Sequence, residues 1–132
     1  EEIDEISWEQ AGDLPLALLR PSMYERAIAE ETFTRAGKKV TPKIESESIL
    51  HLMFQTQFTE LCTIIPSHYT RMPGLHSGTK ALLLKDPVIR KGIGLFWLKT
   101  ETAIPITKIT EEVGRSLAET GELQKFLYRD TL

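Results

Sequence analysis

The stretch from Pro42 to His68, PKIESESILHLMFQTQFTELCTIIPSH, constrains the fold of this chain more than any other. Residues 43–45 favour a short strand, and residues 46–48 are placed to cap a helix. The apolar positions within 49–54 suit a helix buried along one side, and the β-branched run 61–65 ends at Pro66. A strand, a crossover helix and a second strand buried on both faces predict a parallel sheet. Open parallel sheets bind small ligands at the carboxyl ends of their strands. We therefore expect function near residues 20–24, 46–48, 58–60 and 66–68.

A second strand and helix precede this stretch. The continuous apolar run LPLALL, residues 14–19, predicts a central strand. A helix is expected from about 23 to 36, because Ser22 and Glu25 have the spacing of a capping box and Gly37 is placed to end the helix. Its expected inward residues are Met23, Ala27, Ile28 and Phe33.

The two ends of the chain give weaker patterns. Residues 1–13 are polar and acidic, with Ile3, Ile6 and Trp8 as the only large apolar anchors, so we expect a loosely held lead-in. Strands are predicted at 80–84 and 91–98, and these two are expected to pair antiparallel. A helix should begin at Pro105, followed by a tail helix around 122–128. The first of these helices has an apolar stripe formed by Ile106, Ile109, Val113 and Leu117.

Composition limits the class of protein. The chain has 132 residues, of which 41% are hydrophobic and 27% charged, so it predicts one globular domain. The formal charge is −3 and the basic residues are scattered, which argues against direct binding to a nucleic-acid backbone. A lone cysteine excludes an internal disulfide, and no apolar run is long enough for a membrane span. With an acidic start unlike a signal peptide, we expect a cytoplasmic protein without a membrane partner.

No arrangement of residues supports catalysis or a cofactor. Cys62 and His68 would suit a nucleophile and a base, but Cys62 lies in a strand predicted to be buried, whereas reactive thiolates need exposure. The three histidines lack metal-ligand spacing, and Gly92-x-Gly94 falls within a predicted strand, a poor place for a dinucleotide-binding loop. The sequence therefore predicts no enzyme, no metal and no cofactor.

Polar groups at the starts of helices are the remaining candidates. Arg20, Ser22, Ser46 and Ser48 would bring a guanidinium, hydroxyls and backbone N–H groups to one edge of the sheet. Such groups hold small anions, for example a carboxylate or sulfate. The alternative is that Ser22 and Ser46 only cap helices.

Four patterns in one order resemble a known family. They are Trp8-x5-LPLALL at 8–19, FTRAG at 33–37, IES at 44–46 and LCTIIP at 61–66. Together they resemble the second lobe of the effector-binding domain of LysR-type transcriptional regulators, over about residues 6–118. The predicted strand at 91–98 and the helix from 106 fall where that family has its last sheet strand and C-terminal helix.

The resemblance implies an α/β fold similar to that of periplasmic solute-binding proteins. The expected lobe is a three-layer α/β/α structure with a mostly parallel central sheet of about five strands and one antiparallel strand. The 132 residues would be a single domain, a fragment with its second lobe at about 14–100 and C-terminal helices at about 105–129. No helix-turn-helix is visible, so no DNA-binding domain is expected in this chain.

The resemblance also implies the ligand-binding residues. By position these are Pro21, Ser22, Met23, Ser46, Glu47, Phe58, Thr59, Glu60 and Pro66, and the polar groups at the helix starts add Arg20 to this set. One departure matters, because relatives usually have glycines in the turn before the Ile-Ile-Pro strand, where this chain has residues 57–60, QFTE. Larger side chains there would fill part of the cleft or change its specificity.

The implied function is ligand sensing without a chemical transformation. A small effector would favour one arrangement of the lobes, and a homo-oligomer would transmit that change to DNA through an N-terminal helix-turn-helix domain absent from this chain. Two alternatives stay open at this point. One is a lobe of a solute-binding protein or a free-standing sensor, and the other is an α/β enzyme that uses Cys62 and His68.

Overall fold

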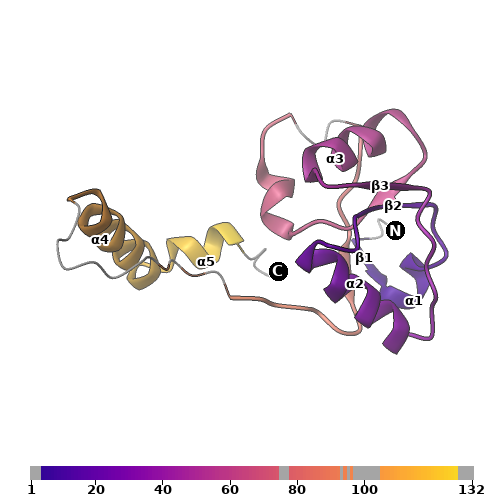
Figure 1. Ribbon diagram of the computed structural model, residues 1–132, viewed down its shortest axis with the longest axis horizontal. Coiled ribbons are helices and arrows are strands. Elements are labelled where there is room, and N and C mark those ends of the chain that lie inside the picture. The colour runs from indigo at the N-terminus through magenta and orange to yellow at the C-terminus, as the bar shows by residue number, and fades with distance from the viewer. Residues whose placement is uncertain (1–3, 75–77, 93, 95, 97–104, 128–132) are drawn as a thin grey trace. The chain divides into compact units, whose positions relative to one another are not determined.

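The computed structural model describes residues 4–74, 78–92, 94, 96 and 105–127. The chain divides into two compact units, residues 1–89 and 90–132. The first unit is mixed α/β with parallel strands in two small sheets, and residues 105–119 and 122–127 of the second are helical (Figure 1). The expectation of a single domain stays a prediction.

The first unit alternates strands and helices. Its elements in chain order are β1 (Glu5–Ser7), α1 (Trp8–Ala11), β2 (Leu16–Leu19), α2 (Tyr24–Arg35), β3 (Ile44–Ser46), α3 (Ile49–Phe58), β4 (Cys62–Thr63), the 3-10 helix η1 (Ser67–Arg71) and β5 (Leu83–Lys85). The strand–helix–strand unit predicted between residues 42 and 66 is therefore confirmed as β3, α3 and β4.

The larger sheet has the order β3-β2-β4, and both pairings are parallel. Leu19 pairs with Ser46 at one end of β2, and Leu16 pairs with Cys62 at the other. All four residues of β2 are buried. The prediction of a central, doubly covered strand at LPLALL is confirmed.

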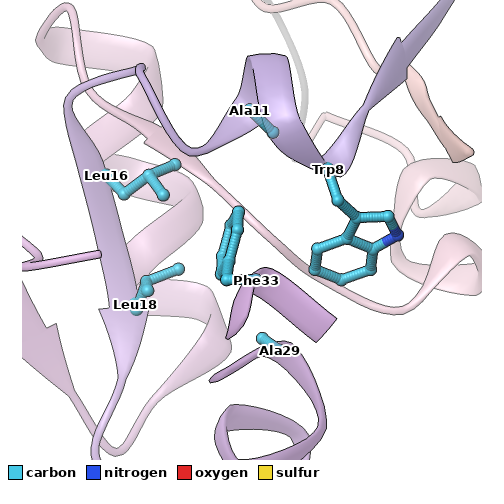
Figure 2. Close-up of a cluster of buried hydrophobic side chains, with 6 residues drawn as sticks. All are labelled: Trp8, Ala11, Leu16, Leu18, Ala29 and Phe33. Atoms are coloured by element: carbon cyan, nitrogen blue, oxygen red, sulfur yellow. The ribbon is translucent and has the colours of Figure 1, made fainter. Parts of the chain in front are cut away.

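The two faces of β2 support separate clusters of side chains. Leu16 and Leu18 pack with Phe33 of α2 and Trp8 of α1, and Figure 2 shows the Phe33 ring between β2 and the Trp8 ring. Ala17 and Leu19 pack instead with Leu52 of α3. Figure 1 accordingly shows α3 on one side of β2 and β3, with α1 and α2 on the other. The alternation follows from the two-residue period of a strand.

Trp8 and Ala11 belong to the core, so the prediction of a loosely held lead-in is wrong for the described part of the N-terminal segment. The Trp8 ring meets Phe33 edge to face, with centroids 5.1 Å apart. Its Nε1–H donates to the Pro87 carbonyl oxygen at 3.0 Å. Ser7 and Gln10 form a capping box that starts α1. A buried tryptophan removes a large apolar area from water, and here its N–H group also has a hydrogen-bond partner. This burial holds the segment in place although most of its residues are polar.

Helix α2 starts differently from its prediction. The expected capping box is wrong, because Met23 is the N-cap residue and no side chain caps the helix, while Ser22 is exposed. Ala27 is also exposed, although it was expected to point inward. The buried residues of α2 are Arg26, Ala29, Thr32 and Phe33.

The predicted end of α2 is confirmed. Gly37 has a φ of +74°, a left-handed conformation that favours glycine. Its N–H donates to the Thr34 carbonyl oxygen at 3.0 Å, and the Lys38 N–H donates to that of Phe33 at 2.8 Å. These two bonds define a Schellman motif.

Two strand predictions need correction. The run 61–65 forms a strand only at Cys62–Thr63, and its residues are half-buried because β4 has a single strand neighbour, β2, in the described sheet. The strand expected at 80–84 appears as β5 and pairs parallel with β1, Glu5 opposite Leu83. Half of its expected antiparallel partner, 91–98, lies outside the described residues.

The second unit confirms both predicted helices, α4 (Pro105–Glu119) and α5 (Glu122–Leu127). Pro105 is the first helical residue, and Gly121, at a φ of +70°, separates the two helices. The apolar stripe of α4 is exposed to solvent. No helix within the described ranges has the length and hydropathy to cross a membrane.

Candidate functional site

The carboxyl ends of β2 and β3 bring one group of predicted site residues together; we call this the carboxyl edge. Leu19 and Ser46 are register partners, and the Arg20 N–H donates to the Ser46 carbonyl oxygen at 3.0 Å. The segment that follows β2 and the start of the loop after β3 therefore lie side by side. The predicted residues at this edge are Arg20, Pro21, Ser22, Met23, Ser46 and Glu47.

Arg20 is held by an exposed ion pair. Its Nη1 lies 3.0 Å from Oε1 of Glu47, and the side chains of Arg20 and Glu47 are 58% and 66% exposed. Exposed pairs of this kind contribute about 0–1 kcal/mol. The guanidinium is therefore near the carboxyl edge and can exchange its partner at low cost.

The sequence patterns did not point to Arg26 as a site residue. Arg26 is a buried cation at this edge, with 5% of its surface exposed. Its Nη1 donates to the Leu19 carbonyl oxygen at 2.6 Å and to Glu45 at 2.8 Å, and its Nε donates to Glu30 at 3.0 Å. These bonds use its donors to fix α2 against the end of β2 and against β3. The i,i+4 spacing of Arg26 and Glu30 was the only available sequence signal.

The two serines of the β3–α3 loop make local hydrogen bonds. The Ser48 Oγ accepts from the His51 N–H at 3.3 Å and caps α3, which confirms the predicted cap in 46–48. The Ser46 Oγ accepts from the Ser48 N–H at 3.1 Å and lies 3.0 Å from His51 Nδ1. His51 Nε2 lies 3.0 Å from the Gln55 amide nitrogen. A hydroxyl, an imidazole and the first N–H groups of α3 thus share one end of the helix.

The structure separates a second group of predicted residues from the first. Phe58, Thr59 and Glu60 precede β4, and the Cys62 N–H donates to the Pro15 carbonyl oxygen at 2.9 Å. Because Cys62 pairs with Leu16 at the start of β2, these three residues lie at the amino ends of the strands. Arg20 and Ser46 lie at the carboxyl ends, so the two groups are at opposite ends of the strands. Thr59 is the C-cap residue of α3, and its hydroxyl donates to the Gln55 carbonyl oxygen at 2.5 Å.

The other end of β4 returns to the carboxyl side. Pro66 follows this strand and is the N-cap residue of η1. Thr63, the register partner of Ala17, shares the α3 face of the sheet, and its buried Oγ1 has no hydrogen-bond partner among the described atoms.

The nucleophile alternative gains no geometric support. Cys62 is half-buried and packs against the cluster of Trp8, Leu16 and Phe33. His68 lies in η1, with its ring centroid 4.5 Å from that of Tyr69. Within the part of the chain that the structure describes, no three His, Cys, Asp or Glu residues are grouped as metal ligands.

Comparison with known proteins adds no relative. No protein-family model matches the chain, and no curated protein or solved structure matches it. The resemblance to LysR-type regulators therefore rests on the sequence patterns alone.

Proposed function

We propose that this chain is a ligand-sensing lobe of a LysR-type regulator and that its carboxyl edge binds a small anion, such as a carboxylate or sulfate. The observation that carries the proposal is the juxtaposition of Arg20 with Ser46 at the adjacent ends of two parallel strands. A guanidinium, a hydroxyl and a helix N-terminus within one edge are groups that bind carboxylates.

The fold supports the proposed lobe in its coarse features. Parallel strands are joined through helices, and side-chain clusters lie on both faces of β2. Both features are expected of a three-layer α/β/α lobe similar to periplasmic solute-binding proteins. The proposed lobe has a mostly parallel central sheet of about five strands and one antiparallel strand, which is a larger sheet than β3-β2-β4.

The charges identify which cation is available to a ligand. Arg26 is buried and already pairs with Glu45 and Glu30, so binding through it would break a satisfied network. Among the described residues, the ion-pair partner of Arg20 is the exposed Glu47, and this contact is weak. An anion would therefore displace Glu47 from Arg20 and accept further hydrogen bonds from Ser46 and the first N–H groups of α3.

The signalling step proposed is a population shift. An effector that contacts this lobe and the first lobe favours one arrangement of the two. In a homo-oligomer that change would reach DNA through an N-terminal helix-turn-helix domain. The proposal places the regulator in the cytoplasm and involves neither a cofactor nor a catalytic step.

The test is a titration of the 15N-labelled chain with sodium malonate, followed through amide chemical shifts at constant ionic strength. Sodium chloride serves as the reference, because it reproduces ionic strength without a carboxylate. We expect saturable shifts at Arg20, Ser46 and the first turn of α3. Substitution Arg20→Gln should weaken binding roughly tenfold, the loss of one charge-assisted hydrogen bond.

The matched control is Arg35→Gln, because Arg35 is an exposed arginine of α2 whose partner is Glu31. This variant should bind malonate as the unmodified chain does. Shifts that grow linearly, that sodium chloride reproduces, or that are equal in both variants would contradict an anion site at the carboxyl edge.

A further inference from the structure

Ser46, His51 and Gln55 form a continuous chain of hydrogen bonds along the first turns of α3. The Ser46 Oγ accepts from the Ser48 N–H at 3.1 Å and lies 3.0 Å from the His51 Nδ1. The other ring nitrogen, Nε2, lies 3.0 Å from the Gln55 amide nitrogen. His51 and Gln55 are four residues apart, so they are neighbours on the helix surface. The chain of bonds therefore connects the middle of α3 with the last residue of β3.

The amide nitrogen of Gln55 sets the direction of these bonds. An amide nitrogen only donates, so the His51 Nε2 accepts from it. A neutral imidazole carries one proton, and when one ring nitrogen accepts, the proton is on the other. The His51 Nδ1–H therefore donates to the Ser46 Oγ.

Both lone pairs of the Ser46 hydroxyl oxygen are then in use. A hydroxyl group offers two lone pairs and one O–H. The Ser48 N–H and the His51 Nδ1–H occupy the two lone pairs, so the O–H has to act as a donor. Ser46 is half-buried at the carboxyl edge, where its carbonyl oxygen accepts from the Arg20 N–H. A hydroxyl held as a donor beside an arginine suits a ligand that only accepts, such as an ionised carboxylate.

We propose that His51 is a positioning residue, which directs the Ser46 hydroxyl toward the anion, and that Gln55 fixes the tautomer of His51 that does so. This inference rests on the proposed function, because it specifies how Ser46 serves the anion site. With the opposite tautomer, the His51 Nδ1 would accept from the Ser46 hydroxyl, and the ligand would lose that donor. The same tautomer argues against catalysis, since a protonated Nδ1 cannot take the hydroxyl proton as a general base does.

The tautomer of His51 is measurable on the unmodified chain without any ligand. Long-range 1H–15N correlation NMR at about pH 8.5, where histidine is ordinarily neutral, distinguishes a protonated ring nitrogen from an unprotonated one. We expect His51 to carry its proton on Nδ1. A proton on Nε2 would mean that Gln55 presents its amide oxygen and that Ser46 donates to His51, which would overturn the proposal.

Substitution Gln55→Glu should reverse the direction of the bonds, because a carboxylate only accepts and would require a proton on the His51 Nε2. The matched control is Gln57→Glu, which adds the same charge to α3 two positions further on, away from the i,i+4 neighbours of His51. We expect Gln55→Glu to move the proton to Nε2. It should also weaken malonate binding roughly fivefold more than Gln57→Glu does, the loss of one neutral hydrogen bond.

A Ser46→Ala background shows whether the effect passes through the Ser46 hydroxyl. In that background, Gln55→Glu and Gln57→Glu should weaken malonate binding equally. Equal effects in the unmodified background, or a difference that persists after Ser46→Ala, would overturn the positioning role. Absence of malonate binding to the unmodified chain would instead contradict the proposed function, while the tautomer measured without malonate would still decide the direction of the bonds.

Discussion

The Arg26 guanidinium donates to the Leu19 carbonyl oxygen at 2.6 Å and so ties the first turn of α2 to the last residue of β2. Removing the guanidinium would leave this buried carbonyl oxygen without its donor and Glu45 without its partner. We expect Arg26→Met to lower the free energy of unfolding by about 2–3 kcal/mol, less than for a fully buried pair because Glu45 is partly exposed. Urea denaturation measures this change.

The control for this prediction is Arg35→Met on the same helix. Arg35 also pairs with a glutamate four residues away, Glu31, but both side chains are exposed. Its substitution should change the stability by less than about 0.5 kcal/mol. Equal losses for the two variants would mean that burial of Arg26 does not set its contribution.

Trp8 should be a structural anchor despite its place near the start of the chain. Trp8→Phe keeps a ring against Phe33 but removes the donor to the Pro87 carbonyl oxygen, so we expect a loss of about 1–2 kcal/mol. Trp8→Ala also removes the ring and should cost about 3–5 kcal/mol. Thermal unfolding of both variants checks the order; a Trp8→Ala protein as stable as the unmodified chain would contradict it.

The elements that the sequence predicted well are those with a local signal. LPLALL is a continuous apolar run of strand length, and the alternation of strands and helices that follows it favours parallel pairing through crossovers. Gly37 ends α2 and Ser48 caps the start of α3, as expected. A left-handed φ and a side-chain cap are properties of single residues, so the sequence shows them directly. Such features need no knowledge of distant partners.

The features that the sequence missed depend on distant partners. Trp8 is buried by Phe33 and bonded to Pro87, which is 79 positions away. A four-residue helix such as α1 is too short for a hydrophobic period to show. Arg26 looks like a solvated residue until β3 is paired with β2 and Glu45 comes within 2.8 Å of it.

The candidate site was predicted in part for the same reason. Arg20 and Ser46 were expected together, because each follows a strand and parallel strands end at one edge. Phe58, Thr59 and Glu60 instead precede β4, so the same parallel arrangement places them at the other edge. Residues that precede a strand were grouped with residues that follow one, and for this reason three predicted site residues lie at the wrong end of the strands.

Thr63 offers a prediction of increased stability. Its Oγ1 is buried without a hydrogen-bond partner among the described atoms, and valine has nearly the same shape without the hydroxyl. We expect Thr63→Val to raise the free energy of unfolding by about 1 kcal/mol, because an unsatisfied buried hydroxyl is removed. Thr32→Val is the contrasting change, because the Thr32 hydroxyl donates to the Ile28 carbonyl oxygen at 2.7 Å. Loss of this hydrogen bond should lower the free energy of unfolding. Destabilisation by Thr63→Val would indicate that its hydroxyl has a partner in solution.

Two glutamates of the β3 strand and its following loop should differ in their effect on anion binding. Glu47 competes with a ligand for Arg20, so Glu47→Gln should raise the affinity for malonate roughly two- to fivefold, the free energy of an exposed ion pair. Glu45 instead pairs with buried Arg26, so Glu45→Gln should lower stability and leave the affinity nearly unchanged. Titration calorimetry and urea denaturation of both variants separate the two effects. If Glu47→Gln leaves malonate binding as it was, Arg20 is not the cation that the anion contacts.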